Sequence, residues 1–203
     1  DCNLETIYSA VTTYSNGPSN FVVNGLSFIE SIAAVPPGPS CQTITMSEGW
    51  SMFSTYMISE DMDITSVLAP INEYVVIAKD NLGNAYLPEW DFNNIGDMTI
   101  GHGYQLKLLQ EGSIEICGDY AFPEDNPIAL NAGWNMIGNA LDATYVDDDN
   151  IVASQLYHFA NGGYTLSDSL LAFKGYFVRA STAGTISYIS AGTVDDTTIT
   201  LTA

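Results

Sequence analysis

The sequence has two histidines, His102 and His158, and their imidazole rings are its candidates for a catalytic general base. Nucleophilic hydrolysis needs a nucleophile, a base and a group that orients the base, all within hydrogen-bonding reach. His102 stands between two glycines, His158 lies inside a β-prone run, and the sequence has no Gly-x-Ser-x-Gly motif. It also lacks a P-loop and a dinucleotide-binding fingerprint. We therefore predict a protein that is not an enzyme, with no catalytic residues and no cofactor.

Acidic residues gather near position 147, and carboxylate oxygens are ligands that Ca²⁺ prefers. The group lacks the spacing and the glycine of an EF-hand loop. Capping of a short helix, together with solvated charge, is the preferred interpretation. Calcium binding is the alternative, and its candidate ligands are Asp142, Asp147, Asp148 and Asp149.

Three cysteines, Cys2, Cys41 and Cys117, have spacings that match no zinc-binding pattern. Cys41 precedes a predicted strand at 43–46, and Cys117 ends a predicted strand at 113–117. If these strands pair antiparallel, the two cysteines lie opposite each other. We therefore predict a Cys41–Cys117 disulfide, with Cys2 unpaired or bonded to another chain, and keep a Cys2–Cys41 bridge as the alternative.

An internal repeat organises most of the chain. Residues 49–53 read Gly-Trp-Ser-Met-Phe and residues 133–137 read Gly-Trp-Asn-Met-Ile. Residues 103–107 read Gly-Tyr-Gln-Leu-Lys and residues 175–179 read Gly-Tyr-Phe-Val-Arg. The first copy is longer between its Trp and its Tyr, and the extra stretch lies at 87–96. A loop insertion of this kind costs little free energy. We predict that the Trp and Tyr anchors pack in the core of each copy.

The elements that surround these anchors predict a mainly β fold with short helices. It consists of two tandem copies of a small β-sandwich or barrel-like module. An Asn-Gly-Gly turn in the second copy is a strong hairpin signal. We expect short helices at 61–68, ended by Pro70, and at 147–153. The predicted organisation is an N-terminal arm with a Pro-rich linker at 1–40, modules at 41–120 and 121–192, and a strand or tail at 193–203.

The first copy, with residues 49–53, 76–83, 86–90 and 101–107, resembles a recurrent module of large exported proteins. These proteins come from marine bacteria, notably Bacteroidetes-like ones, and from some aquatic viruses. The resemblance extends loosely to the second copy and leaves the N-terminal arm unassigned. It implies a tandem accessory domain of a surface protein, and no catalytic residues are attached to the module. The family pattern often has a cysteine near the position of Met57, which this sequence lacks.

The charge balance restricts the partners of the protein. The chain has 4 Lys and Arg against 24 Asp and Glu, a net charge of −20. Such a surface repels phosphate backbones, so nucleic acid is not an expected partner. No run approaches the roughly 20 apolar residues of a membrane span, so we expect no membrane insertion. The composition suggests a secreted protein of the cell surface or the extracellular space, and the Asp1–Cys2 start suggests either a processed mature terminus or a fragment of a larger protein.

We expect a structural or adhesive protein, namely a subunit of a surface filament or layer that assembles with copies of itself. Its terminal segments would exchange strands, because residues 197–202 alternate Thr with aliphatic residues and the predicted assembly residues are Thr198, Ile199, Thr200 and Leu201. The first alternative is a module that binds glycans or surfaces through a platform of Tyr86, Trp90 and Phe92. The second alternative is a virion surface protein.

Overall fold

The computed structural model describes residues 40–121, 125–138, 143–147, 149–160, 162–167 and 170–190, and only the backbone of 143–146, 160 and 188–190. These residues all lie within one compact unit, Pro36–Ala203. We call 40–121 the first half and 125–190 the second half. Residues 1–39 and 191–203, which contain Cys2 and the predicted assembly residues, lie outside the described part of the chain.

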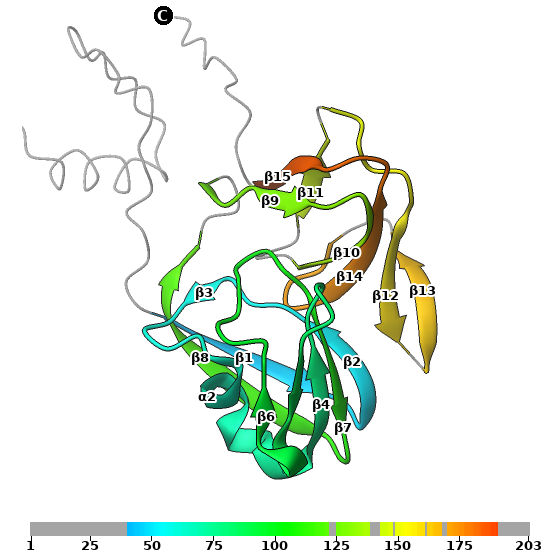
Figure 1. Ribbon diagram of the computed structural model, residues 1–203. Helices are drawn as coiled ribbons and strands as arrows, with labels where there is room; N and C mark the ends of the chain where they lie inside the picture. The colour runs from blue at the N-terminus through cyan, green and yellow to red at the C-terminus, as the bar shows by residue number, and fades with distance from the viewer. Residues whose placement is uncertain are drawn as a thin grey trace, which may run out of the picture. The chain divides into compact units, whose positions relative to one another are not determined.

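Two antiparallel sheets enclose the hydrophobic core of the first half (Figure 1). One sheet has the order β1-β8-β3 and the other the order β2-β7-β4-β5-β6. Every second residue of β1 and of β7 is buried, as expected for strands with one face on a core. The strands are β1 (Ser40–Met46), β2 (Gly49–Phe53), β3 (Met57–Ile58), β4 (Val75–Lys79), β5 (Ala85–Leu87), β6 (Phe92–Asn93), β7 (Tyr104–Leu108) and β8 (Gly112–Tyr120).

Short helical segments connect the strands of the first half: α2 (Ile64–Leu68), η1 (Ala69–Tyr74) and η2 (Pro88–Trp90). The Asp63 side chain accepts a hydrogen bond from the Thr65 amide and caps α2. The predicted helix at 61–68 therefore starts later than expected. Pro70 lies in the first turn of η1, where its missing N–H leaves no hydrogen bond unmade.

The second half has two further antiparallel sheets, with the orders β10-β14-β12-β13 and β11-β15-β9. Its core contains buried residues from both sheets, among them Ile128, Ile137, Tyr176 and Ile186. The strands are β9 (Ile128–Leu130), β10 (Gly133–Gly138), β11 (Ala143–Val146), β12 (Leu156–Ala160), β13 (Gly163–Ser167), β14 (Gly175–Ala180) and β15 (Gly184–Ser190).

The two halves pair their strands in the same pattern. In the first half β8 pairs with β1 and β3, and in the second half β15 pairs with β9 and β11. Likewise β7 pairs with β2 and β4, as β14 pairs with β10 and β12. The first half has in addition α2, η1, η2 and the edge strand β6. The origin of the halves by duplication of one module stays a prediction.

The predicted helix at 147–153 is wrong. The Asp147 carboxylate accepts hydrogen bonds from the amides of Ile151 and Val152, and Asn150 has a φ of 53°. These contacts turn the chain toward β14, where Val152 forms a β-bridge with Ala180. A short polar side chain that binds nearby amides here competes with the helix.

The fold is mainly β, as the sequence predicts. In the part of the chain that the structure describes, no helix is long and apolar enough to cross a membrane.

Candidate functional site

The two tyrosine anchors, Tyr104 and Tyr176, are buried and have the same role. The Tyr104 hydroxyl accepts a hydrogen bond of 2.7 Å from the amide of Thr99, and the Tyr176 hydroxyl one of 2.7 Å from the amide of Leu171. Each tyrosine hydroxyl thus holds the loop that precedes its own strand, because the amide that donates to it lies five residues earlier in the chain.

The two tryptophan anchors do not pack in the cores, which corrects the prediction from the repeat. Trp134 is 54% exposed, and Trp50 is only partly buried. Successive side chains of a strand point to opposite faces. In β2, Phe53 faces the core, and Trp50 therefore lies on the outer face of its sheet.

Five aromatic rings cover the outer face of β10-β14-β12-β13, and we call this set the aromatic face. The rings form a chain of contacts, with centroid distances of 5.3 to 6.4 Å between neighbours. Such separations suit edge-to-face pairs. The members of the aromatic face are Trp134, Tyr157, Phe159, Tyr164 and Phe177.

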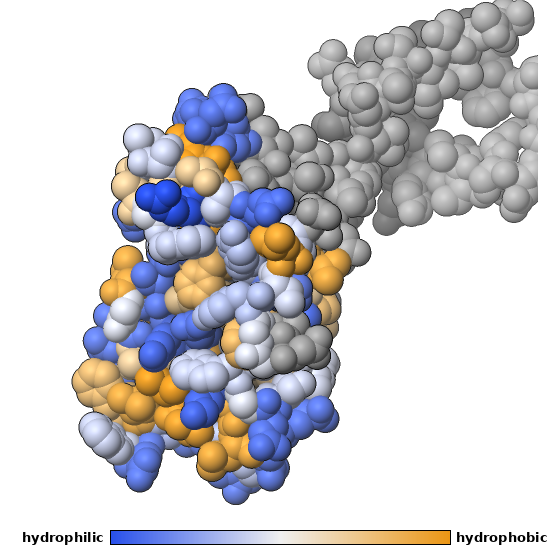
Figure 2. Space-filling model, turned by 90° about the vertical axis from the view of Figure 1, so that its right-hand side faces the viewer, coloured by the Kyte–Doolittle hydropathy of each residue, from blue (hydrophilic) through white to orange (hydrophobic). Residues whose placement is uncertain are grey.

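Much of the aromatic face is open to solvent. Tyr164 is 52% exposed and its neighbour on the same face, Leu166, is 56% exposed. Figure 2 shows the side of the molecule on which β12 and β13 lie in Figure 1, with orange and pale residues among hydrophilic blue ones. Exposed aromatic rings in mutual contact are typical of a surface that binds a partner.

Trp50, the counterpart of Trp134, has cationic neighbours. The ammonium groups of Lys79 and Lys107 lie 5.5 and 5.9 Å from the centre of its ring. These are cation–π distances.

A cleft of about 560 Å³ lies between β2 and the β12–β13 hairpin. Trp50 and Phe159 line it together with the charged residues Glu48 and Lys174 and with His158. The two halves are also joined by a hydrogen bond of 2.9 Å from the Gln105 side-chain amide to the Tyr164 hydroxyl. The cleft therefore connects the ring of Trp50 to the aromatic face.

Backbone contacts that match pairwise join the two halves. The amide of Ser54 donates to the carbonyl of Phe173 at 3.1 Å, and the amide of Gly138 donates to the carbonyl of Gly101 at 2.8 Å. Ser54 corresponds to Gly138 in the repeat, and Gly101 corresponds to Phe173. Each half therefore donates the same backbone hydrogen bond to the other, and the two bonds are related by a local pseudo-twofold axis.

Phe173 occupies the position in this junction that glycine occupies in the first half. It has a φ of 70°, and its counterpart Gly101 has a φ of 79°. A left-handed conformation is uncommon for a bulky residue. The Phe173 ring stacks on Tyr56 of the first half with a centroid distance of 5.6 Å. This contact across the junction offsets the conformational cost.

The two histidines lie in different surroundings. Burial lowers the pKa of His102, and the nearby Asp80 carboxylate partly opposes this effect. Burial also lowers the pKa of His158, and the charge of Lys174 acts in the same direction. Both rings are therefore biased toward the neutral form.

The predicted platform of Tyr86, Trp90 and Phe92 is wrong for one member. Tyr86 is only 6% exposed, since it faces the core of the first half and its hydroxyl donates to Asn72. Trp90 and Phe92 are 74% and 44% exposed. They stand at the insertion, in η2 and β6, at the far edge of the β2-β7-β4-β5-β6 sheet.

The calcium candidates are partly described. Both carboxylate oxygens of Asp147 accept backbone amides at 2.8 Å, and Asp149 is exposed. Asp142 and Asp148 lie outside the described residues. Among those described, the ligand atoms that come together as a possible metal site belong to Cys41, Glu115 and Cys117.

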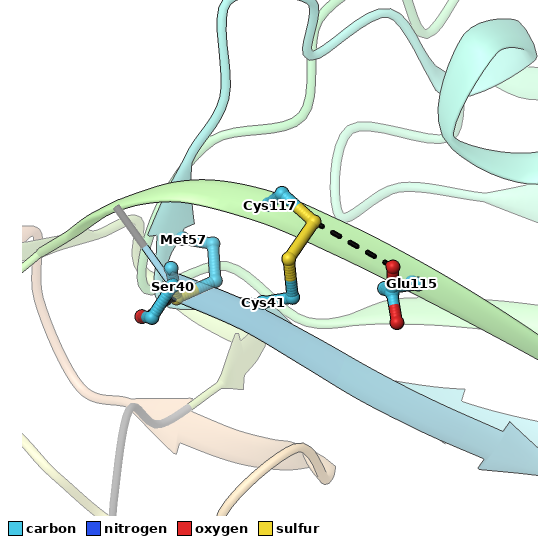
Figure 3. The surroundings of a disulfide bond; sticks show 5 residues. All are labelled: Ser40, Cys41, Met57, Glu115 and Cys117. Atoms are coloured by element: carbon cyan, nitrogen blue, oxygen red, sulfur yellow. Dashed lines mark hydrogen bonds between the residues drawn. A yellow bond between two sulfur atoms is a disulfide. The ribbon is translucent and has the colours of Figure 1, made fainter. Parts of the chain in front are cut away.

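A disulfide joins Cys41 to Cys117, which is the pair that the strand arrangement predicts (Figure 3). The two residues are direct partners in the β1–β8 register, on the exposed face of their sheet. A carboxylate oxygen of Glu115 approaches the sulfur of Cys117 to 3.7 Å. The sulfurs of a disulfide are poor metal ligands, because the thiolate is the species that coordinates.

The aromatic face was missed in the sequence, although a signal for it is present. Tyr157 and Phe159 alternate in one strand, and Tyr164 and Leu166 alternate in the next. A period of two with large apolar residues on a single face identifies a sheet surface.

No family model, no curated protein and no solved structure matches this chain.

Proposed function

We propose that this chain is a non-enzymatic extracellular adhesive protein whose contact surface is the aromatic face. The observation that carries the proposal is the set of five touching rings on one outer sheet face, with Trp134 and Tyr164 each more than half exposed. Glycans fit such a surface, because the C–H faces of sugar rings pack on the electron-rich faces of aromatic rings.

The test compares two exposed tryptophans on different surfaces. Trp134→Ala removes an exposed ring of the aromatic face, and Trp90→Ala removes an exposed ring from the insertion. Binding to a panel of immobilised polysaccharides and to whole cells is measured for each variant. We expect Trp134→Ala to weaken binding about tenfold, as for a contact worth roughly 1.4 kcal/mol, and Trp90→Ala to leave it unchanged.

Loss of binding with Trp90→Ala alone would move the contact surface to the insertion with Trp90 and Phe92. Wild-type binding in both variants would contradict an adhesive role for either tryptophan. Circular dichroism of each variant shows whether the fold is intact, so that a loss of binding can be assigned to the ring itself.

A second candidate function is that of a subunit of a surface filament or layer, made of copies of this chain. The observation that favours it is an edge strand, β13, which is the last strand of its sheet in the part of the chain described. A sheet edge with exposed side chains is a template for strand addition. Electron microscopy of native material, with size-exclusion chromatography of the purified chain, tests this candidate.

A further inference from the structure

The outer edges of the two equivalent sheets differ. In the first half β6 pairs with β5 in the register Tyr86↔Asn93 and Leu87↔Phe92. The backbone of Ala85 is also satisfied there, because its amide donates to the Asn94 side chain at 2.7 Å and its carbonyl accepts from the Asn94 amide at 3.1 Å. The insertion thus covers the edge of the first half.

The second half lacks this insertion. Its corresponding strand, β13, pairs with β12 on one side and ends the sheet on the other, within the described residues. The three central residues of β13, Tyr164, Thr165 and Leu166, are all exposed. An uncovered edge with exposed Tyr and Leu side chains is a site for strand addition.

The hairpin register shows which backbone groups face the open edge. Two residues separate the closing pair Ala160↔Gly163, and the closing pair of a two-residue hairpin is hydrogen-bonded. Hydrogen-bonded and non-bonded pairs alternate along an antiparallel ladder. Thr165 therefore directs its N–H and C=O toward β12, while Tyr164 and Leu166 direct theirs toward the open edge.

We infer that this edge of β13 accepts the segment Thr197–Thr202 from a second copy of the chain. The segment alternates Thr with Ile199 and Leu201, as a strand with two unlike faces does. Lying antiparallel to β13, as β6 lies along β5, it brings Ile199 and Leu201 beside Tyr164 and Leu166. Aliphatic and aromatic side chains stabilise such cross-strand pairs.

This inference rests on the assembly role proposed as the second candidate function, and it is independent of glycan binding by the aromatic face. It names the acceptor edge and the donor segment of the contact. One copy supplies each, so the contact is head-to-tail. Contacts of this kind produce open polymers unless the rotation closes a ring.

Two full-length variants separate acceptor from donor. Leu166→Pro removes an outward N–H of β13, and proline is tolerated in an edge strand on its solvent side. Its matched control, Leu166→Ala, keeps the N–H and shortens the side chain. The donor variant combines Ile199→Asp with Leu201→Asp, which places charges on the apolar face of the donated strand.

Sedimentation of the variants, alone and mixed, is the experiment. We expect the acceptor variant and the donor variant each to be monomeric, and their mixture to form a 1:1 dimer through the one intact edge and the one intact segment. Leu166→Ala should still assemble, but more weakly than the wild type, because it keeps the outward N–H and loses only the side-chain contact. If the mixture stays monomeric, or if Leu166→Pro assembles like the wild type, the inference is overturned.

Failure of the assembly role can be told apart from failure of this contact. A wild-type chain that stays monomeric while the mixed variants dimerise supports the pairing of β13 with the segment and contradicts the assembly role, because each chain then pairs with its own segment. Wild-type polymers that persist in Leu166→Pro support assembly and overturn the inference about β13.

Discussion

Trp50 and Trp134 occupy the same place in the two halves and differ in what surrounds them. Two lysines lie over the ring of Trp50, whereas Trp134 contacts Tyr157 and Phe177. The inner faces of the two sheets are much more alike, and each contains a buried tyrosine with the same hydrogen bond. The core and the loops thus define the scaffold, while the outer positions differ, because a solvent-facing side chain is not constrained by packing.

The contact between the two halves is close enough for one added methyl group to disrupt it. In Gly138→Ala the added Cβ would lie 2.0 Å from the Cβ of Ser54 and 2.9 Å from the carbonyl oxygen of His102. We expect a loss of about 3 kcal/mol in the free energy of unfolding, because the junction must move apart. Urea denaturation measures it.

Gly163→Ala is the matched control, because its Cβ would meet no atom within 4 Å. We expect its stability to stay within about 0.5 kcal/mol of the wild type. Equal stability of the two variants would mean that the halves are not packed as described.

The disulfide distinguishes the halves next. It closes a loop with a sequence separation of 76, for which chain entropy gives a stabilisation of about 4.5 kcal/mol at most. We expect the double variant Cys41→Ser/Cys117→Ser to lose roughly 2–4 kcal/mol. Backbone hydrogen exchange should become faster in β1 and β8, and it should change less in β9 and β15.

Cys2→Ser is the control for this prediction, since it removes the third thiol and leaves the bridge. Faster exchange spread evenly over both halves would contradict a bridge that acts on the first half.

The two buried tyrosines sharpen the comparison, because they should behave alike. Tyr104→Phe and Tyr176→Phe each remove an acceptor and leave the amide of Thr99 or Leu171 without its partner. We expect each variant to lose about 1 kcal/mol of stability. Thermal or urea unfolding of both variants tests this, and a loss confined to one of them would show that the loops are not equivalent.

The smallest expected effect concerns pH. Burial lowers the pKa of His102 below its ordinary value of 6.5, so the folded state favours the neutral ring. The unfolded chain then binds the proton more readily, and this contribution to stability is present above pH 6.5 and is lost as the pH falls below that value. His102→Gln should lose stability less steeply between neutral and mildly acidic pH than the wild type.

The matched control for the histidine is His158→Gln, because burial lowers the pKa of His158 as well. This substitution, which lies in the second half, should also make the loss of stability with falling pH less steep than in the wild type. A steeper slope in either variant would contradict the direction of these pKa shifts.

Much of the fold could be predicted from local patterns. The Asn-Gly-Gly turn of the second half and the repeated Gly-Trp and Gly-Tyr runs indicated the order of the main elements. The strands β3 and β11 were missed, because two to four residues carry too little periodicity. The helix expected at 147–153 was wrong because acidic residues cap turns as readily as helices.

The candidate site depended on more distant relations. The outer placement of Trp50 could not be predicted, since β2 has a buried side chain on each face, Met52 and Phe53. A period of two identifies the face of a strand only when one face is polar. Met52 is buried because the second half packs against it at Gly175, which no local pattern in β2 indicates.

The sequence by itself determined the main strands and turns and favoured the pairing of Cys41 with Cys117, because each follows from residues adjacent in the chain or from one antiparallel register. Only the tertiary structure decided that Trp50 and Trp134 lie outside the cores, that Phe173 stacks on the first half, and that β13 is the last strand of its sheet among the described residues. The physical reason is that exposure depends on which distant surface covers a residue, and the pattern of a single strand contains no information about that surface.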